Sequence, residues 1–518
     1  MRFDNQKYCI GTVFIASILL SACGGSTNTS PTSSEPIVAA TVPVVTSTGT
    51  DFYLTLPDHI CVSDPKECDY NPVTNKLIIA AFTATTGEVK FNGAITPFFV
   101  AAGGQVVITL DPAVVLTSNE LVEAKGIHVT ALSPVSVHVV SENAHSADGY
   151  LALPTPGLGT KYYVMSYAST GDTGSEFAVV ATQNATTVSI TPTAAGATRP
   201  AGVAFTVMLN AGETYQLANP ANADMTATLV TSDKPVAVFG GHLCANIPSD
   251  VGYCDYLVEQ LPDVSLWGKT FHTSPFSGRT RYTVRVIAAQ DNTTFTTVPA
   301  GLVGTLNAGQ FVDVVLSGAA EFVSSNPVLV AQFMHGYADD SAWKGDPSMV
   351  LVTPAEMGMN DATFGVHGLA GTVGGYMNIV TETASLAGLT LDNVAVNTAL
   401  FTPIGGTSIY SHATIPLATG AHTLLGTVPY SAFVYGYGAT AWNAVSYAYP
   451  VAAKLSAAST INAGACTDND DESHSGTGHD DLDELHTGEH PHQHAHDHSH
   501  DGAHDHAHDD GDDEVCQE

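Results

Sequence analysis

The sequence predicts an all-β body made of four repeats of about 100 residues, and two observations support this. Short runs rich in Val, Thr, Tyr and Phe, such as residues 282–287, alternate with Gly, Pro, Asn and Asp, which is typical of strands joined by turns. No long segment has helical periodicity. In addition, a proline opens a Val-rich strand at Pro134, Pro235 and Pro327, and more weakly at Pro429, with spacings of 92 to 102 residues.

Other markers recur in the same phase. A glycine turn lies at Gly104, Gly212, Gly309 and Gly420, and a strand ends in proline at Pro57, Pro154, Pro262 and Pro354. Each repeat has room for about seven or eight strands, which favours a β-sandwich, with a pair of four-stranded β-propeller blades as the alternative. The loops after the Pro-Val strands, at residues 141–149, 241–256, 335–348 and 436–446, should emerge at equivalent edges and carry a binding surface.

The N-terminus predicts export and lipidation. Arg2 and Lys7 precede an apolar stretch that is too short to span a bilayer, so residues 1–22 are interpreted as a signal peptide. The stretch ends in Leu-Ser-Ala followed by Cys23, a lipobox in which the cysteine becomes acylated and forms the new N-terminus. Gly24 follows it, which is typical of lipoproteins sent to the bacterial outer membrane.

Composition divides the exported chain into three parts. Residues 23–50 are rich in Ser, Thr and Pro and predict a flexible linker. Residues 51–455 form the β repeat body, and residues 456–518 form an acidic, His-rich tail predicted to be disordered. The formal charge is −35, from 50 acidic and 15 basic residues, which argues against nucleic acid as a partner. The tail holds 18 of the acidic residues and no Lys or Arg.

Six cysteines remain in the exported chain besides Cys23. An even number in an oxidising compartment favours disulfides, and proximity in sequence suggests that neighbours pair, although other pairings stay open. The suggested pairs are Cys61 with Cys68, Cys244 with Cys254, and Cys466 with Cys516.

The tail concentrates residues that bind transition metals. Imidazoles alternate with other residues in a His-x-His pattern, interleaved with aspartates, and neutral imidazole is a good ligand for Zn, Ni and Cu ions. The predicted ligands are His490, His492, His494, His496, His498, His500, His504, His506 and His508. The alternative is a solvated acidic tail without a metal role.

The second repeat resembles a known family. Residues 159–164, 209–213, 234–242, 244–248 and 254–262 are similar to the N-terminal domain of the IgGFc-binding protein. The resemblance covers roughly residues 150–365. It implies an extracellular recognition or adhesion module without enzymatic activity.

No motif indicates a catalytic site: the sequence lacks a Gly-x-Ser-x-Gly elbow, His-Glu-x-x-His and a phosphate-binding glycine loop. His242 and His335 are interpreted as hydrogen-bonded residues at strand ends, and Trp343 and Trp442 as packing residues. The leading hypothesis is a non-enzymatic surface lipoprotein held by its lipid anchor, which binds an extracellular protein or glycan and carries a metal-binding tail. The alternatives are a metal-scavenging lipoprotein with the body as scaffold and, less favoured, a glycan-active hydrolase.

Overall fold

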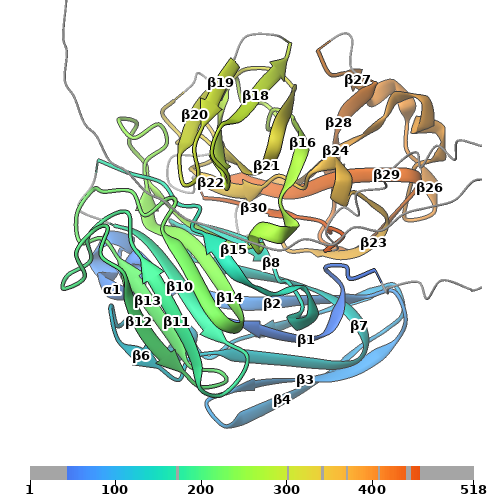
Figure 1. Ribbon diagram of the computed structural model, residues 1–518. Coiled ribbons are helices and arrows are strands. Elements are labelled where there is room, and N and C mark those ends of the chain that lie inside the picture. Colours follow the sequence, from blue (N-terminus) through green and yellow to red (C-terminus); the bar gives the residue numbers. More distant parts are fainter. Residues whose placement is uncertain are drawn as a thin grey trace, which may run out of the picture. The chain divides into compact units, whose positions relative to one another are not determined.

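The computed structural model describes residues 44–455 apart from gaps at 171–173, 300–302, 340–342, 369–371, 406–408 and 439–444. Within this range the chain forms four β repeats, as predicted (Figure 1). The predicted signal peptide, most of the predicted linker and the tail lie outside the described residues. Among the described residues, no helix is both long and apolar enough to cross a membrane.

The first two repeats contain the following elements. Repeat 1 consists of β1 (Gly49–Leu54), α1 (Ile60–Ser63), η1 (Pro65–Cys68), β2 (Thr74–Ala81), β3 (Thr85–Phe91), β4 (Ala94–Val100), β5 (Gly104–Thr109), η2 (Pro112–Val114), β6 (Val122–Glu123), β7 (Ile127–Glu142) and β8 (Ala147–Leu151). Repeat 2 consists of η3 (Thr155–Gly157), β9 (Gly159–Tyr163), β10 (Ser175–Ala181), β11 (Thr186–Thr191), β12 (Phe205–Leu209), β13 (Thr214–Ala218), β14 (Leu229–Ala245) and β15 (Asp255–Leu261).

The last two repeats follow the same plan. Repeat 3 consists of η4 (Val264–Leu266), β16 (Gly268–Thr273), β17 (Tyr282–Ala288), β18 (Thr293–Val298), β19 (Val303–Leu306), β20 (Phe311–Leu316), β21 (Ala320–Met334) and β22 (Ser348–Leu351). Repeat 4 consists of η5 (Ala355–Met357), β23 (Met359–Val366), β24 (Thr372–Glu382), η6 (Thr383–Gly388), β25 (Thr390–Leu391), β26 (Val394–Ala395), η7 (Thr398–Leu400), β27 (Thr402–Pro403), β28 (Tyr410–Leu417), β29 (Gly420–Gly438) and β30 (Ser446–Pro450).

One long strand organises each repeat: β7, β14, β21 or β29. Its first half pairs with the first strand of the repeat and with one strand of a hairpin. In repeat 3, for example, β21 pairs with β16 and with β18, and β18 forms the hairpin with β19. Its second half pairs with the last strand of the repeat and with a further strand pair, as β21 pairs with β22 and with β17, the latter bonded to β20. The two layers share the long strand and enclose a core, which agrees with the sandwich-like prediction.

The repeat prolines lie at the corner where the long strand leaves one layer for the other. In all four repeats the pairing between the first strand and the long strand is irregular at this corner. Two successive pairs are two residues apart on the first strand but five residues apart on the long strand, for example Gly268↔Val328 and Thr270↔Val323 around Pro327. The prediction that these prolines open a strand is therefore wrong in one respect, because each lies inside a longer strand. Proline is tolerated there because it cannot donate a ladder hydrogen bond and the ladder is already interrupted.

Two of the other markers also need correction. In repeats 1 to 3 the predicted glycine turn precedes equivalent strands, and its left-handed residues are Gly103, Gly212 and Gly309. Gly420 instead begins the long strand β29. In repeat 4 the segment with η7 and the short strand β27 takes the place of that glycine turn before β28. Similarly, Pro154, Pro262 and Pro354 follow the last strand of a repeat, whereas Pro57 follows the first.

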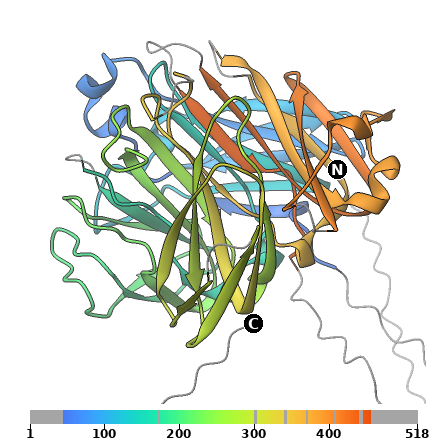
Figure 2. The same ribbon diagram turned by 90° about the horizontal axis from the view of Figure 1, so that it is seen from above.

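The repeats share their cores in a closed cycle. In β10, Phe177 and Val179 face the core of repeat 2, whereas Ala178 and Val180 face that of repeat 1. In the same way Ala331 and Phe333 of repeat 3 enter the core of repeat 2, Tyr435 and Tyr437 of repeat 4 enter that of repeat 3, and Ile78 and Val140 of repeat 1 enter that of repeat 4. Figure 2 shows the four repeats in their sequence colours.

The two ends of the described chain close this cycle. Thr46 forms an isolated antiparallel bridge with Lys454. The amide of Ser47 donates to the carbonyl of Ala453 (2.8 Å), and the amide of Leu455 donates to the carbonyl of Val45 (2.7 Å). The first and last described residues of the body therefore lie next to each other.

Candidate binding surface

The last strands of the four repeats, β8, β15, β22 and β30, contact one another around a common centre. The fully buried carboxylate of Asp148 joins them. It accepts hydrogen bonds from the backbone amides of Val258 (3.3 Å), Met349 (3.2 Å) and Ala448 (3.2 Å), one from each of the other three inner strands. One side chain thus fixes the relative positions of all four repeats.

A second buried carboxylate supports this centre. Asp255 accepts hydrogen bonds from the Ser146 hydroxyl (2.6 Å) and from the amides of Ala147 (2.7 Å) and Ser446 (3.1 Å). Burial raises the pKa of both Asp148 and Asp255 well above the usual range, despite these hydrogen bonds. Within the described part of the chain, no group of three or more His, Cys, Asp and Glu side chains is arranged to hold a metal ion. The hydrogen bonds that Asp148 and Asp255 accept from backbone amides of other repeats give both acids a structural role.

Three connections lead into the inner strands β8, β15 and β22, as expected from the repeat pattern: residues 143–146, residues 246–254 and the described parts of 335–347. The first is only four residues long, and residues 439–444 of the fourth predicted loop lie outside the described residues. We call the end of the inner strands where these connections lie the loop end. The amide of Gly336 donates to the carbonyl of Ile247 (2.7 Å), which joins the second and third loops. The amide of Gly345 donates to the carbonyl of Gly438 (2.9 Å), which joins the third loop to the fourth repeat.

Three aromatic side chains gather where the second and third loops meet, and we call them the aromatic cluster: Tyr253, Tyr337 and Trp343. The ring centroids of Tyr253 and Tyr337 lie 5.3 Å apart, and those of Tyr337 and Trp343 lie 5.5 Å apart. Tyr253 is 51% exposed and Trp343 is 53% exposed. Both adopt left-handed backbone conformations, with φ of 71° and 48°, which are unfavourable for bulky residues and recur at ligand-binding sites.

A buried polar network holds the third loop in place. Both ring nitrogens of His335 form hydrogen bonds: Nε2 with the Thr283 hydroxyl (2.8 Å) and Nδ1 with the Asp339 carboxylate (2.6 Å). Arg281 contacts both oxygens of Asp339 (2.9 and 2.5 Å), and Arg279 donates to the carbonyls of His335 and Gly336 (3.0 Å each). Burial lowers the pKa of His335, although Asp339 opposes that shift.

The contacts among Thr283, His335 and Asp339 have the hydroxyl, imidazole and carboxylate order of a nucleophilic triad. However, Thr283 is 2% exposed and His335 is fully buried, so a substrate cannot reach the hydroxyl. The arrangement therefore positions the loop that carries Tyr337 and Trp343.

Two of the predicted disulfides are present, Cys61–Cys68 and Cys244–Cys254. The second closes the loop that carries Tyr253, directly before Cys254. In both disulfides a buried histidine two residues before the first cysteine accepts the cysteine amide at Nδ1: His59 for Cys61 (3.1 Å) and His242 for Cys244 (3.0 Å). The shared His-x-Cys pattern is visible in the sequence and could have indicated this role.

Other predicted residues stand as follows. His242 and His335 are buried and hydrogen-bonded, in agreement with the structural interpretation. Trp343 is half exposed and its ring contacts Tyr337 on the same loop, so it is not a core packing residue as interpreted from the sequence. Cys23, Trp442, Cys466, Cys516 and the nine predicted metal-binding histidines lie outside the described residues.

The fold defines a closed four-repeat β protein, and the aromatic cluster at its loop end is a candidate binding surface. The family model described as IgGFc binding protein matches residues 148–436, more than half of the sequence. The chain therefore belongs to the IgGFc-binding protein family. The match begins in β8, so repeat 1 lies largely outside it. Repeat 1 nevertheless has the same strand pairing as the three matched repeats.

A similar protein is the human IgGFc-binding protein, which is 28% identical over 312 residues. The match covers 58% of this chain and 6% of that protein. Among solved structures, a 1.5-MDa bacterial ice-binding adhesin shows a TM-score of 0.12 and 11% identity, covering 60% of this chain and 98% of that one. A Ca²⁺-stabilized ice-binding adhesin of an Antarctic bacterium shows a TM-score of 0.11 and 12% identity, covering 78% and 98%. Likeness at these TM-scores supports no argument about fold or function.

Proposed function

We propose that this protein is a non-enzymatic, surface-displayed lipoprotein that binds an extracellular protein or glycan through its loop end. The aromatic cluster is the observation that carries the proposal. Exposed Tyr and Trp side chains on rigid loops, with Arg beside them, have the composition of binding hot spots. The disulfide and the buried His335 network order these loops before a partner arrives, which reduces the entropic cost of binding.

The position of the chain ends supports the proposed orientation. Residues 45–47 and 453–455 meet beyond the final residues of the inner strands, whereas the loops lie before their first residues. A chain tethered through the linker at Cys23 would therefore present the loop end away from the outer membrane.

The binding proposal is tested with Tyr337→Ala and Trp343→Ala on the full mature chain, using a panel of immobilised IgG Fc, other serum proteins and mucin glycans. We expect at least one probe to be retained and each substitution to weaken its binding about tenfold or more. The matched control is Phe82→Ala, which removes an aromatic ring that is 64% exposed on the β2–β3 turn. Equal losses in all three variants, or no retained probe, would contradict the proposal.

Lipidation is tested separately. Cys23→Ser should abolish acyl labelling and release the protein from membranes, because two or three acyl chains provide stable attachment. Unchanged membrane attachment would rule out the proposed anchor.

We also propose that the tail binds Zn, Ni or Cu ions through its histidines. Exposed imidazole titrates near pH 6.5, so protons compete with the metal, and binding should be strong at pH 7.5 and largely lost near pH 5. Calorimetric titration compares the mature chain with a version ending at Ala465. Equal uptake by both would exclude the tail as the metal site, and uptake without any partner binding by the loop end would favour metal scavenging as the main function.

A further inference from the structure

A second candidate site lies at the opposite end of the inner strands, where β8, β15, β22 and β30 finish. Here lies a pocket with a cavity volume of about 60 Å³. Its walls come from all four repeats and from the segment that follows β30, with Leu151, Leu266, Leu351, Met357 and Leu455 among the apolar side chains.

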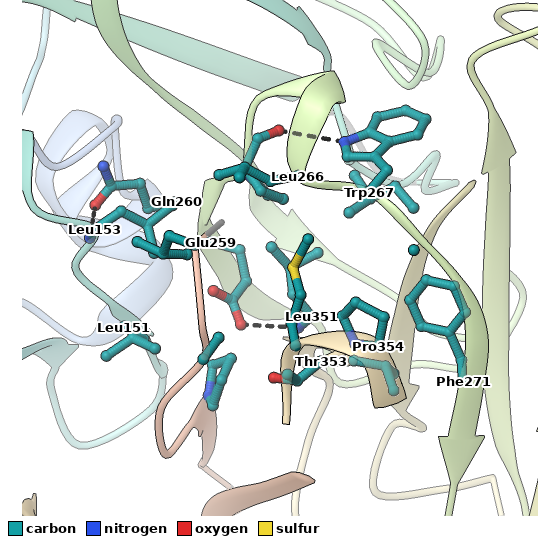
Figure 3. Close-up of a pocket in the computed structure, with 18 of the residues that line it drawn as sticks. Leu151, Leu153, Glu259, Gln260, Leu266, Trp267, Phe271, Leu351, Thr353 and Pro354 are labelled. Carbon is teal, nitrogen blue, oxygen red and sulfur yellow. Dashed lines mark hydrogen bonds between the residues drawn. The ribbon is translucent and has the colours of Figure 1, made fainter. Parts of the chain in front are cut away.

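Glu259 is the single ionisable side chain among the described residues that line this pocket. Figure 3 shows its carboxyl group between Leu151 and Leu351, with the rings of Trp267 and Phe271 on one side of the pocket. One carboxyl oxygen accepts the amide of Leu351 (3.0 Å), which joins repeats 2 and 3.

The neighbouring residue adds a polar group that is not satisfied. Gln260 is 2% exposed, and its amide oxygen accepts the amide of Leu153 (2.9 Å). Its Nε2 group has no hydrogen-bond partner among the described residues. This Nε2 group is a donor and would need an acceptor, so it does not favour a cationic ligand. The carboxyl of Glu259 is the group in this apolar cavity that a cation would complete.

We propose that this pocket binds the ammonium group and aliphatic stem of a primary alkylamine, with Glu259 as the counterion. The stem would lie along the Leu and Met side chains, as the stem of a lysine does on an apolar surface. The head would pair with the carboxylate, and the aromatic rings provide faces that attract cations. The strongly acidic chain would attract such a ligand from solution.

The electrostatics of the pocket agree with this ligand. Burial raises the pKa of Glu259 well above its usual range, and the buried Asp148 nearby adds to the effect. Burial alone therefore favours the neutral form of this acid. An entering ammonium ion favours the carboxylate, and the displaced proton goes to solvent, so that no net charge is buried.

The probes are n-butylammonium and its uncharged counterpart 1-butanol, titrated into the mature chain that carries Cys23→Ser. We expect n-butylammonium to bind with a millimolar Kd and 1-butanol at least tenfold more weakly. Binding is located by the indole N–H resonance of Trp267, whose Nε1 donates to the carbonyl of Pro262 (3.3 Å). A shift confined to the other tryptophans would place the ligand elsewhere and overturn the proposal.

The decisive variant is Glu259→Gln, because glutamine still offers an oxygen to the Leu351 amide. It should lose the preference for the amine over the alcohol, whereas Ala453→Phe should block both ligands by filling the pocket. Equal binding of both ligands by the unaltered chain, or unchanged amine binding by Glu259→Gln, would refute the role of Glu259.

A further arm distinguishes a free amine from the lysine side chain of a partner. It compares peptides with a central lysine or norleucine, both blocked at their ends. Tighter binding of the lysine peptide than of n-butylammonium identifies a protein lysine as the source, and weaker binding identifies a free amine.

Discussion

At the scale of single residues, Arg285 is a buried charge that contacts two carboxylates and two aromatic rings. It lies at the junction of repeats 2 and 3 with a side chain that is 3% exposed. Asp224 and Asp313 each accept from it at 2.7 Å, and its guanidinium stacks over the rings of Tyr167 (4.7 Å) and Phe311 (4.3 Å). Burial alone would lower the pKa of Arg285, but the two carboxylates reverse that effect and raise it.

Arg285→Met should destabilise the body by about 3 kcal/mol, because it leaves two carboxylates without their counterion in a largely buried site. The measurement is urea unfolding followed by circular dichroism. Lys90→Met provides the control, since Lys90 and Glu88 are both more than 40% exposed and such pairs contribute at most about 1 kcal/mol. Similar losses in the two variants would show that burial does not give Arg285 its importance.

At the scale of elements, the connection between β14 and β15 shows how the candidate surface is made rigid. The strand ends at Ala245, the next begins at Asp255, and Cys244–Cys254 closes the connection. His242 fixes the amide of Cys244, and the Gly336 amide fixes the carbonyl of Ile247. A Cβ atom at Gly336 would approach the carbonyl oxygen of Gly252 to 3.1 Å, so glycine allows the two loops to pack closely.

Replacing Cys244 and Cys254 together by serine should cost about 3 kcal/mol of stability, because the unfolded chain gains the freedom of an open loop. It should also release Tyr253 from its left-handed conformation, so any probe bound at the loop end should dissociate faster. Thermal unfolding and surface plasmon resonance test the two effects. The same change at Cys61 and Cys68 is the control for binding, and an equal rise in the dissociation rate there would contradict the local role of Cys244–Cys254.

At the scale of the whole molecule, closure of the repeats concentrates acids in the interior. Asp148, Asp255, Glu259, Asp346 and Glu176 are all buried, and burial raises the pKa of each well above its usual range. Burial also raises the pKa of Asp58 to about 7. The opposite shift occurs in buried histidines: burial lowers the pKa of His59 to about 3 and of His138 and His242 to about 4, and it also lowers the pKa of His272 and His335.

These shifts predict that stability falls as the pH rises above about 6.5. Because the pKa of each of these acids is higher in the body than in the unfolded chain, raising the pH ionises them more readily in the unfolded chain and so favours unfolding. The histidines are neutral in both states there and contribute only below pH 6.5, where unfolding takes up protons. Each acid contributes at most about 1.4 kcal/mol per pH unit.

Urea unfolding at pH 6.5, 7.5 and 8.5 tests this prediction. Glu176→Gln should reduce the slope, because both carboxyl oxygens of Glu176 are buried without a hydrogen-bond partner among the described residues and glutamine cannot ionise. Stability that rises with pH over this range would show that the buried acids are already ionised in the folded state.

The sequence by itself determined the all-β class, the four repeats and two of the disulfides. These follow from local signals: strand composition, prolines such as Pro235 and Pro327, and cysteines close together in the chain. The pattern could not show that each proline lies at a corner within one long strand, because strand pairing decides where a strand continues.

Only the tertiary structure decided how the repeats join and where the candidate sites lie. The shared cores and the contacts of Asp148 with all three other repeats depend on residues up to 300 positions apart, which no local pattern relates. The exposure of Trp343 and the isolation of Glu259 in an apolar pocket have the same origin. The burial of a carboxyl group, and therefore its pKa, depends on how the whole chain packs and not on the residues next to it in the sequence.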